Sequence, residues 1–246
     1  FHIAPMQCYT NQPLRKLFHL LSPSSIKWTE MEKVDDIYPK TKSADYLFDA
    51  LEKRLGPPQN YDEASNLVLQ LGSNDPSRLQ SCVQHAVQSY NFKEINLNCG
   101  CPSSAVSGRA GGVSHMKDPM HVAKCVEAMN QAVTDLYHSD SIDSMTTKDT
   151  DNDNDNDCHV SPIPISVKHR LGVRDAATYN AQEDQLKNDE EEAFPTCREF
   201  VKAITFSGDV SKVQVHARLG LLGDFDASDA SATTASTTSA SSASST

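Results

Sequence analysis

Short apolar runs alternate with stretches of helical periodicity from the first residue of this chain onward. Such an alternation is typical of repeated βα units, in which each strand enters a parallel sheet and the following helix packs on it. Six runs fit this pattern as strands: Phe1–Met6, Ile26–Met31, Leu67–Leu71, Glu94–Asn98, Ile163–Lys168 and Lys212–His216. The sequence therefore predicts an α/β protein built on a parallel sheet.

Amphipathic stretches lie between these runs, with apolar residues returning every three to four positions, as one face of a helix requires. The clearest are Pro13–Leu21, Ser43–Leu55, Pro76–Tyr90 and Pro119–Tyr137. Asp75 and Asp118 each precede a proline at the first helical position, so both are expected to cap a helix N-terminus.

Three polar segments interrupt the pattern. His138–His159 contains the acidic run DNDNDND, Glu183–Glu192 is a shorter charged loop, and Ala227–Thr246 is almost entirely Ser, Thr and Ala. None of them has the large apolar residues that a core needs. We expect one domain over residues 1–225 with a solvated insertion at about 138–160, followed by a disordered tail at 226–246.

The composition limits the classes of partner and compartment. A formal charge of −11 argues against non-specific nucleic-acid binding through overall charge, although the acidic tracts carry much of it and leave room for a local basic surface. Seven cysteines without a CxxC pair indicate reduced thiols and hence an intracellular protein, of the cytoplasm or an organelle. No apolar run reaches the length of a membrane span, so we expect no membrane association. Because the chain begins at Phe1, a targeting peptide upstream would not be seen.

The residues that follow the apolar runs form the candidate site, since a parallel barrel carries its working groups at the carboxyl ends of its strands. These residues are Ala4-Pro5-Met6, Gln70, Asn96 to Ser103, Lys168-His169-Arg170 and His216-Ala217-Arg218. Amides, a cation and apolar backing are the groups that a flavin ring requires. Cys99 and Cys101 form a CxC pair without further ligands at metal spacing, so we interpret them as packing thiols and predict no metal site.

The segments APM, TEM, LQLGSNDP, EINLNCGCPS, VKHRLG and VHAR occur in this order between Phe1 and about Arg218. In these motifs the chain resembles the FMN-dependent tRNA-dihydrouridine synthases, most closely their A-type branch. The resemblance implies a TIM-type (β/α)8 barrel, here truncated to about six βα units with acidic low-complexity insertions. The last units would then belong to a missing C-terminal half, come from a partner chain, or be lost in a degenerate gene product.

The resemblance also implies roles for individual residues. In the family, FMN reduced by NADPH passes hydride to a uracil in the D-loop of tRNA, and a cysteine protonates the ring. Asn98 would contact the target uridine, and Arg170 and Arg218 would bind the substrate. The residues expected at the FMN are Ala4, Pro5, Met6, Gln70, Lys168 and His216.

The chain departs from the family at two places. In the family the loop after CPS carries the acid cysteine, whereas this chain has no cysteine between Ser103 and Met116. Ser114 stands at that position by spacing and His115 is the neighbouring substitute, so proton donation should be slowed by about 10² to 10⁴. The glycine-rich phosphate loops and the helical tRNA-binding domain are not recognisable after Arg218, so we expect weak FMN and tRNA binding.

Two alternatives to an active synthase stay open. Ser114 and the missing loops fit a catalytically inactive remnant or a binding module with the same fold. Another FMN barrel oxidoreductase acting on a small molecule is the second, against which the block NLNCGCPS together with VKHRLG argues.

Overall fold

The computed structural model describes residues 1–56, 66–103, 106, 111–145, 163–175 and 189–223, with the backbone alone at 138–145 and 189–196. Its centre is a six-stranded sheet in the order β1-β2-β3-β4-β5-β7, in which every neighbouring pair is parallel. The strands are β1 (His2–Ile3), β2 (Ile26–Lys33), β3 (Leu67–Gly72), β4 (Glu94–Cys99), β5 (Ile165–Arg170) and β7 (Lys212–His216). The predicted parallel sheet is therefore confirmed, with one strand for each apolar run.

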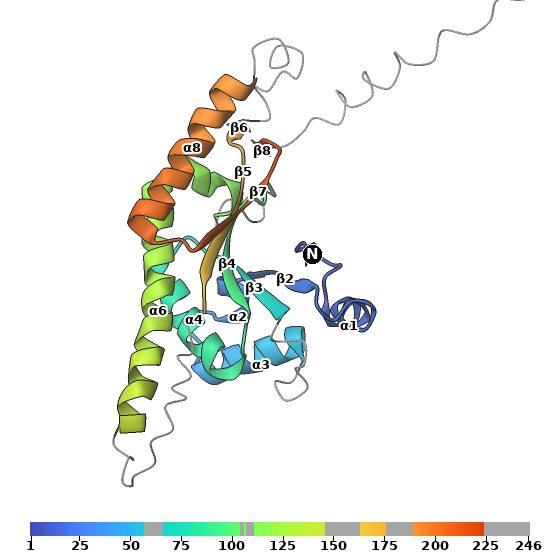
Figure 1. The fold of residues 1–246 in the computed structure, drawn as a ribbon, viewed down its shortest axis with the longest axis vertical. Coiled ribbons are helices and arrows are strands. Elements are labelled where there is room, and N and C mark those ends of the chain that lie inside the picture. The colour runs from blue at the N-terminus through green and yellow to red at the C-terminus, as the bar shows by residue number, and fades with distance from the viewer. Residues whose placement is uncertain (57–65, 104–105, 107–110, 146–162, 176–188, 224–246) are drawn as a thin grey trace, which may run out of the picture.

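The helices form a layer on one side of this sheet (Figure 1). Helices α3 (Ala44–Leu55), α4 (Pro76–Ser89), α6 (Pro119–Met145) and α8 (Asp189–Gly208) contact one another in sequence order, as successive βα units require. The short α2 (Val34–Ile37) joins β2 to this layer, and α1 (Gln12–Leu21) stands at the β1–β2 edge. No helix in the described part of the chain is long and apolar enough to cross a membrane.

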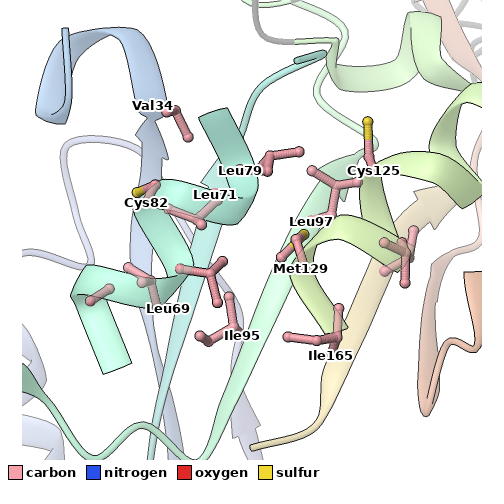
Figure 2. Close-up of a cluster of buried hydrophobic side chains, with 14 of the residues drawn as sticks. Val34, Leu69, Leu71, Leu79, Cys82, Ile95, Leu97, Cys125, Met129 and Ile165 are labelled. Atoms are coloured by element: carbon pink, nitrogen blue, oxygen red, sulfur yellow. The ribbon is translucent and has the colours of Figure 1, made fainter. Parts of the chain in front are cut away.

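The core lies between the sheet and the helix layer (Figure 2). Alternate residues of a strand point to opposite faces, so Leu69 and Leu71 on β3 and Ile95 and Leu97 on β4 project toward α4 and α6. All four are fully buried. The residues between them, Gln70 and Asn96, point to the opposite face, which is polar. One face of the sheet therefore packs in the hydrophobic core, and the opposite face carries polar side chains.

Sheet curvature brings the two edge strands toward each other across the polar face. The pKa of His2 on β1 is lowered by burial and, next, by the Lys212 ammonium on β7. Pro5, which follows β1, and His216, at the end of β7, also line one and the same cavity, so the sheet curls. The curled parallel sheet with helices outside is part of a (β/α) barrel, as expected.

Several boundaries differ from those predicted. The first strand is only two residues long instead of Phe1–Met6, and β5 begins at Ile165 and continues to Arg170. Helix α6 runs to Met145, so residues 138–145, which were expected to belong to the solvated insertion, have a helical backbone. Helix α8 begins at Asp189, inside the charged loop expected at Glu183–Glu192, because a run of glutamates favours a helix when apolar residues follow. The rest of the predicted insertion and the tail predicted at 226–246 lie outside the described residues.

A small second sheet was not predicted. Strands β6 (Val173–Asp175) and β8 (Gly220–Leu222) pair in parallel above the main sheet. A 3₁₀ helix, η3 (Gly112–Lys117), lies against both β4 and β8. At three residues each, these strands are too short to show a sequence period.

The predicted helix caps are present. The Asp75 carboxylate accepts hydrogen bonds from the backbone N–H of Ser77 at 3.1 Å and of Arg78 at 3.3 Å. We expect Asp75→Ala to lower the free energy of unfolding by about 1 kcal/mol, because two N–H groups of the first turn lose their acceptor. Urea unfolding measures this, with Asp45→Ala in the first turn of α3 as the control, since α3 has no side-chain cap. Equal losses in both variants would contradict the capping role.

Candidate active site

A cavity of about 660 Å³ opens at the carboxyl ends of the strands. Its volume lies within the range of cofactor and substrate sites. The described residues that line it are Pro5, Gln7, Met31, Lys33, Asp36, Arg54, Gln70, Asn98, Gly100, Cys101, Pro102, Ser103, Val106, Lys168, Arg170 and His216. They come from β2, β3, β4, β5 and β7, from α2 and α3, and from the segments after β1 and β4, so the fold gathers them from across the chain.

Two buried amides form part of the cavity wall. Asn98 Nδ2 donates to Gln70 Oε1 at 3.0 Å, and Gln70 Nε2 donates to Asn96 Oδ1 at 2.8 Å. Asn98 Oδ1 accepts from the backbone N–H of Gly100 at 3.1 Å and of Cys101 at 3.0 Å. Both amides are thereby fixed before any ligand enters.

Cationic side chains give the cavity a charge opposite to that of the whole chain. Lys33, Arg54, Lys168 and Arg170 line it together with a single described carboxylate, Asp36. The Arg170 guanidinium is positioned by the carbonyls of Gly100 at 2.7 Å and Leu219 at 3.0 Å. Such a wall attracts phosphate and other anions despite the acidic composition.

Burial and repulsion between positive charges lower the pKa values of two lining residues, Lys168 and His216. Burial, and then Arg170, lowers the pKa of Lys168. The pKa of His216 is lowered by burial and then by Arg170, Lys168 and Arg218. A ligand carrying negative charge would relieve this repulsion.

The far side of the cavity carries an ion pair. Arg54 Nη1 lies 2.6 Å from Glu32 Oε2, and the Glu32 side chain is buried beneath it. Burial raises the pKa of Glu32 to about 7, and Arg54 opposes that rise. Part of the Arg54 charge is therefore compensated, which leaves Lys168 and Arg170 as the stronger anion-binding end.

Cys101, which lies within the candidate stretch Asn96 to Ser103 but was interpreted as a packing thiol, lies in the cavity wall. Its half-buried side chain packs with Met31 and Val106. Among the described lining residues it is the only cysteine. The available signal was its position, two residues after the end of β4 at Cys99. Cys99, by contrast, is fully buried on the core side, as a packing thiol should be.

Ser114 and His115, the candidates for the acid, lie on η3 and do not occur among the described lining residues. The Ser114 hydroxyl donates to the Gly111 carbonyl. His115 is buried, with Nδ1 3.4 Å from Cys99 Sγ, and burial followed by His121 lowers its pKa to about 4. Their catalytic role remains a prediction from the sequence.

The depressed pKa of His115 predicts a pH dependence of stability. Below pH 6.5 the unfolded state binds a proton that the folded state refuses until about pH 4, so stability falls as the pH falls through this window. The contribution is about 3 kcal/mol. We expect His115→Leu to flatten the unfolding free energy between pH 7 and 4 by about this amount, while a His85→Gln control keeps the wild-type slope. Chemical denaturation at several pH values decides; parallel curves for His115→Leu and wild type would refute the assignment.

The other residues predicted at the site fall into two groups. Pro5, Gln70, Asn98, Lys168, Arg170 and His216 all line the cavity. Ala4, Met6 and Arg218 do not occur among the described lining residues. Met6 is 42% exposed, and its carbonyl accepts the N–H of Thr10, so its backbone shapes the turn before α1.

Metal chemistry was not expected here. In the described part of the chain, no group of three or more His, Cys, Asp or Glu side chains could ligate a metal ion. The site described so far is that of an α/β barrel protein with an amide, cation and thiol wall.

Comparison with known proteins gives the family. Residues 2–158 match the family model for dihydrouridine synthase (Dus). A curated relative from Xanthomonas campestris pv. campestris, tRNA-dihydrouridine(20/20a) synthase, is 32% identical over 177 residues, which cover 72% of this chain and 41% of the relative. Proteins of the same name from Pseudomonas putida and Escherichia coli K12 are 28% and 27% identical, over 90% and 89% of this chain.

The chain belongs to the dihydrouridine synthase family, as the motifs predicted, since the family model matches more than half of it. It spans less than half the length of these three relatives, at 41%, 49% and 47%. The family folds as a TIM barrel, and the six parallel strands of this chain form part of such a barrel.

Proposed function

We propose that this chain carries the FMN-binding part of a tRNA-dihydrouridine synthase, which reduces uridine in the D-loop of tRNA with NADPH as the source of electrons. The observation that supports this most is the cavity, where Gln70, Asn98, Cys101 and Lys168 meet at the carboxyl edge of the sheet. Activity on tRNA is proposed from the family and from relatives named for that reaction. Because tRNA is the substrate, the protein would act inside the cell.

The residues present fit FMN. The flavin ring is flat and carries carbonyl oxygens along one edge, which the amide N–H groups of Gln70 and Asn98 can bind. Lys168 and His216 lie at the same end of the cavity and suit the electron-rich side of the ring. FMN, once bound and reduced, supplies the hydride. Pro5, with Ala4 and Met6 beside it in the chain, would back the ring.

The remaining wall fits a pyrimidine nucleotide. Asn98 can donate to a uracil carbonyl, and Arg170, with Arg218 two residues beyond His216, can bind the phosphates of the nucleic acid. The target base must leave the RNA stack to enter such a cavity. The cations of the cavity wall favour the approach of a polyanion.

We further propose that Cys101 donates the proton to uracil C5. Its backbone is fixed on both sides, since its N–H donates to Asn98 Oδ1 and its carbonyl accepts from Val113 N–H at 2.9 Å. Ser114 and His115 stay as the alternative acids predicted from the sequence. A thiol in the wall supports an enzyme over a catalytically inactive binding module of the same fold.

FMN titration of the purified chain tests the proposal. Binding should quench flavin fluorescence and shift the visible flavin bands, and excess inorganic phosphate should compete weakly. Riboflavin, which lacks the phosphate, separates ring binding from phosphate binding. If neither flavin binds at high micromolar concentration, the proposed function of this chain falls.

A further inference from the structure

A ladder of polar side chains crosses the inner face of the sheet from the cavity to its opposite end. Gln70 Nε2 donates to Asn96 Oδ1 at 2.8 Å. Asn96 Nδ2 in turn donates to Ser166 Oγ at 2.8 Å and to Gln214 Oε1 at 3.0 Å. Ser166 and Gln214 then both donate to Glu94 Oε1. Glu94 Oε2 lies 2.6 Å from Lys212 Nζ.

The ladder has a direction, and it can be derived from the loop end. The backbone N–H groups of Gly100 and Cys101 are donors, so the atom of Asn98 that meets them must be its oxygen. The Asn98 nitrogen then faces Gln70, which must present its own oxygen. The Gln70 nitrogen then faces Asn96, which must present its oxygen, and the Asn96 nitrogen faces Gln214 in the same way. Every amide therefore donates in the direction away from the cavity loop.

A ladder in which every member donates onward must end on a group that only accepts. Glu94 is that group: one carboxylate oxygen receives two donors and the other receives the Lys212 ammonium. Glu94 is 1% exposed and does not occur among the described lining residues of the cavity. An amide at this position could not satisfy all three donors, because its NH2 group would face one of them.

We propose that Glu94, paired with Lys212, is a positioning residue: as the accepting end of the ladder it holds, through Ser166, Gln214 and Asn96, the hydrogen-bond direction that the loop N–H groups impose at Asn98. The consequence reaches the ligand. Both acceptor positions of Asn98 Oδ1 are filled by backbone N–H groups, so Asn98 offers the cavity an N–H alone. The wall therefore selects a ligand that presents a carbonyl oxygen there. That this ligand is a flavin or a uracil rests on the proposed function; the direction of the ladder does not.

Moving the carboxylate along the ladder provides the test. In Asn96→Asp, residue 96 can no longer donate hydrogen bonds to Ser166 and Gln214. If these two side chains turn and donate to the new carboxylate, their own acceptor oxygens face the Glu94 carboxylate, and acceptor then meets acceptor. In Glu94→Gln, the amide NH2 faces Lys212 or the two donors. In the double variant the segment between residues 94 and 96 reverses: Gln donates to Ser166 and Gln214, both bond to Asp, and the Gln oxygen accepts from Lys212. Residues 70 and 98 are not substituted in any of these variants, so a change in ligand binding reports on how the ladder holds their side chains.

Thermal unfolding of the four proteins should be strongly non-additive. We expect each single variant to lose about 3–8 °C in Tm, because one or two buried polar groups are left without a partner. The Tm of the double variant should be higher than that of the less stable single variant. Asn96→Asp combined with Asp75→Ala, which is remote from the ladder, is the control and should be additive. Additive losses in the Glu94→Gln and Asn96→Asp pair would overturn the proposal. A double variant that folds where a single one does not would support it.

FMN affinity gives a second readout that a purely structural role would not move in the same way. Glu94→Gln should weaken FMN binding by about 3- to 10-fold, and Asn96→Asp in the same chain should restore most of it. Unchanged affinity in Glu94→Gln, with the wild type binding FMN, would contradict the positioning role. If the wild type binds no flavin, the proposed function fails, while the Tm cycle still decides on the ladder.

Discussion

Replacing Cys101 with alanine should lower the rate of uridine reduction by about 10² to 10⁴-fold, the usual contribution of a positioned general acid. The loss should appear in the step that consumes reduced flavin, because hydride transfer to C6 leaves a charge at C5 that needs the proton. Binding of FMN should change little, since the thiol is one small part of the wall. Single-turnover oxidation of reduced flavin by unmodified tRNA measures the step.

Ser114→Ala is the matched control. The Ser114 hydroxyl already donates to the Gly111 carbonyl, and Ser114 does not occur among the described lining residues, so its loss should alter the rate by less than about 3-fold if Cys101 is the acid. A large loss in Ser114→Ala with a small one in Cys101→Ala would reverse the assignment in favour of the acid predicted from the sequence.

Replacing Lys168 with methionine should weaken FMN binding by about 10- to 100-fold, the value of one charge-assisted hydrogen bond. Methionine keeps the length of the apolar stem, so the variant removes the charge and little packing. Repulsion from Arg170, which now lowers the pKa of Lys168, disappears with the ammonium and should offset a small part of the loss. Flavin fluorescence at fixed ionic strength gives the dissociation constants.

Lys93→Met controls for the change in net charge, because Lys93 is exposed and is not among the described lining residues of the cavity. It should leave FMN affinity within a factor of two. Equal affinities in Lys168→Met and wild type would remove Lys168 from the flavin site, whatever else binds there.

The strands could be predicted because their signal is local. The runs Leu67–Leu71 and Glu94–Asn98 place apolar residues on the core face, and the structure has strands at both, each extended by one residue. The paired strands β6 and β8 could not be predicted, because Val173 and Gly220 meet only after β7 has folded beside β5. Long-range pairing of this kind leaves no period in the sequence.

In the site, too, residues with a local sequence signal could be predicted and those that depend on long-range contacts could not. Gln70, Asn98 and Lys168 could be predicted because each ends a strand, and parallel strands end at the same edge. Cys101 lay in the predicted stretch Asn96 to Ser103, but the CxC pair favoured a packing role for it. The structure separates the two cysteines, with Cys99 in the core and Cys101 beside Met31 and Val106. The Glu94 ladder was missed, since it depends on the register of β3, β4, β5 and β7.

The measurement that tests the central claim most directly is the dihydrouridine content of unmodified tRNA after incubation with the chain, FMN and NADPH. The account predicts dihydrouridine in the D-loop of the wild-type reaction, and its loss in the Cys101→Ala reaction. Bound flavin that NADPH reduces, with no dihydrouridine formed on any tRNA, would contradict it.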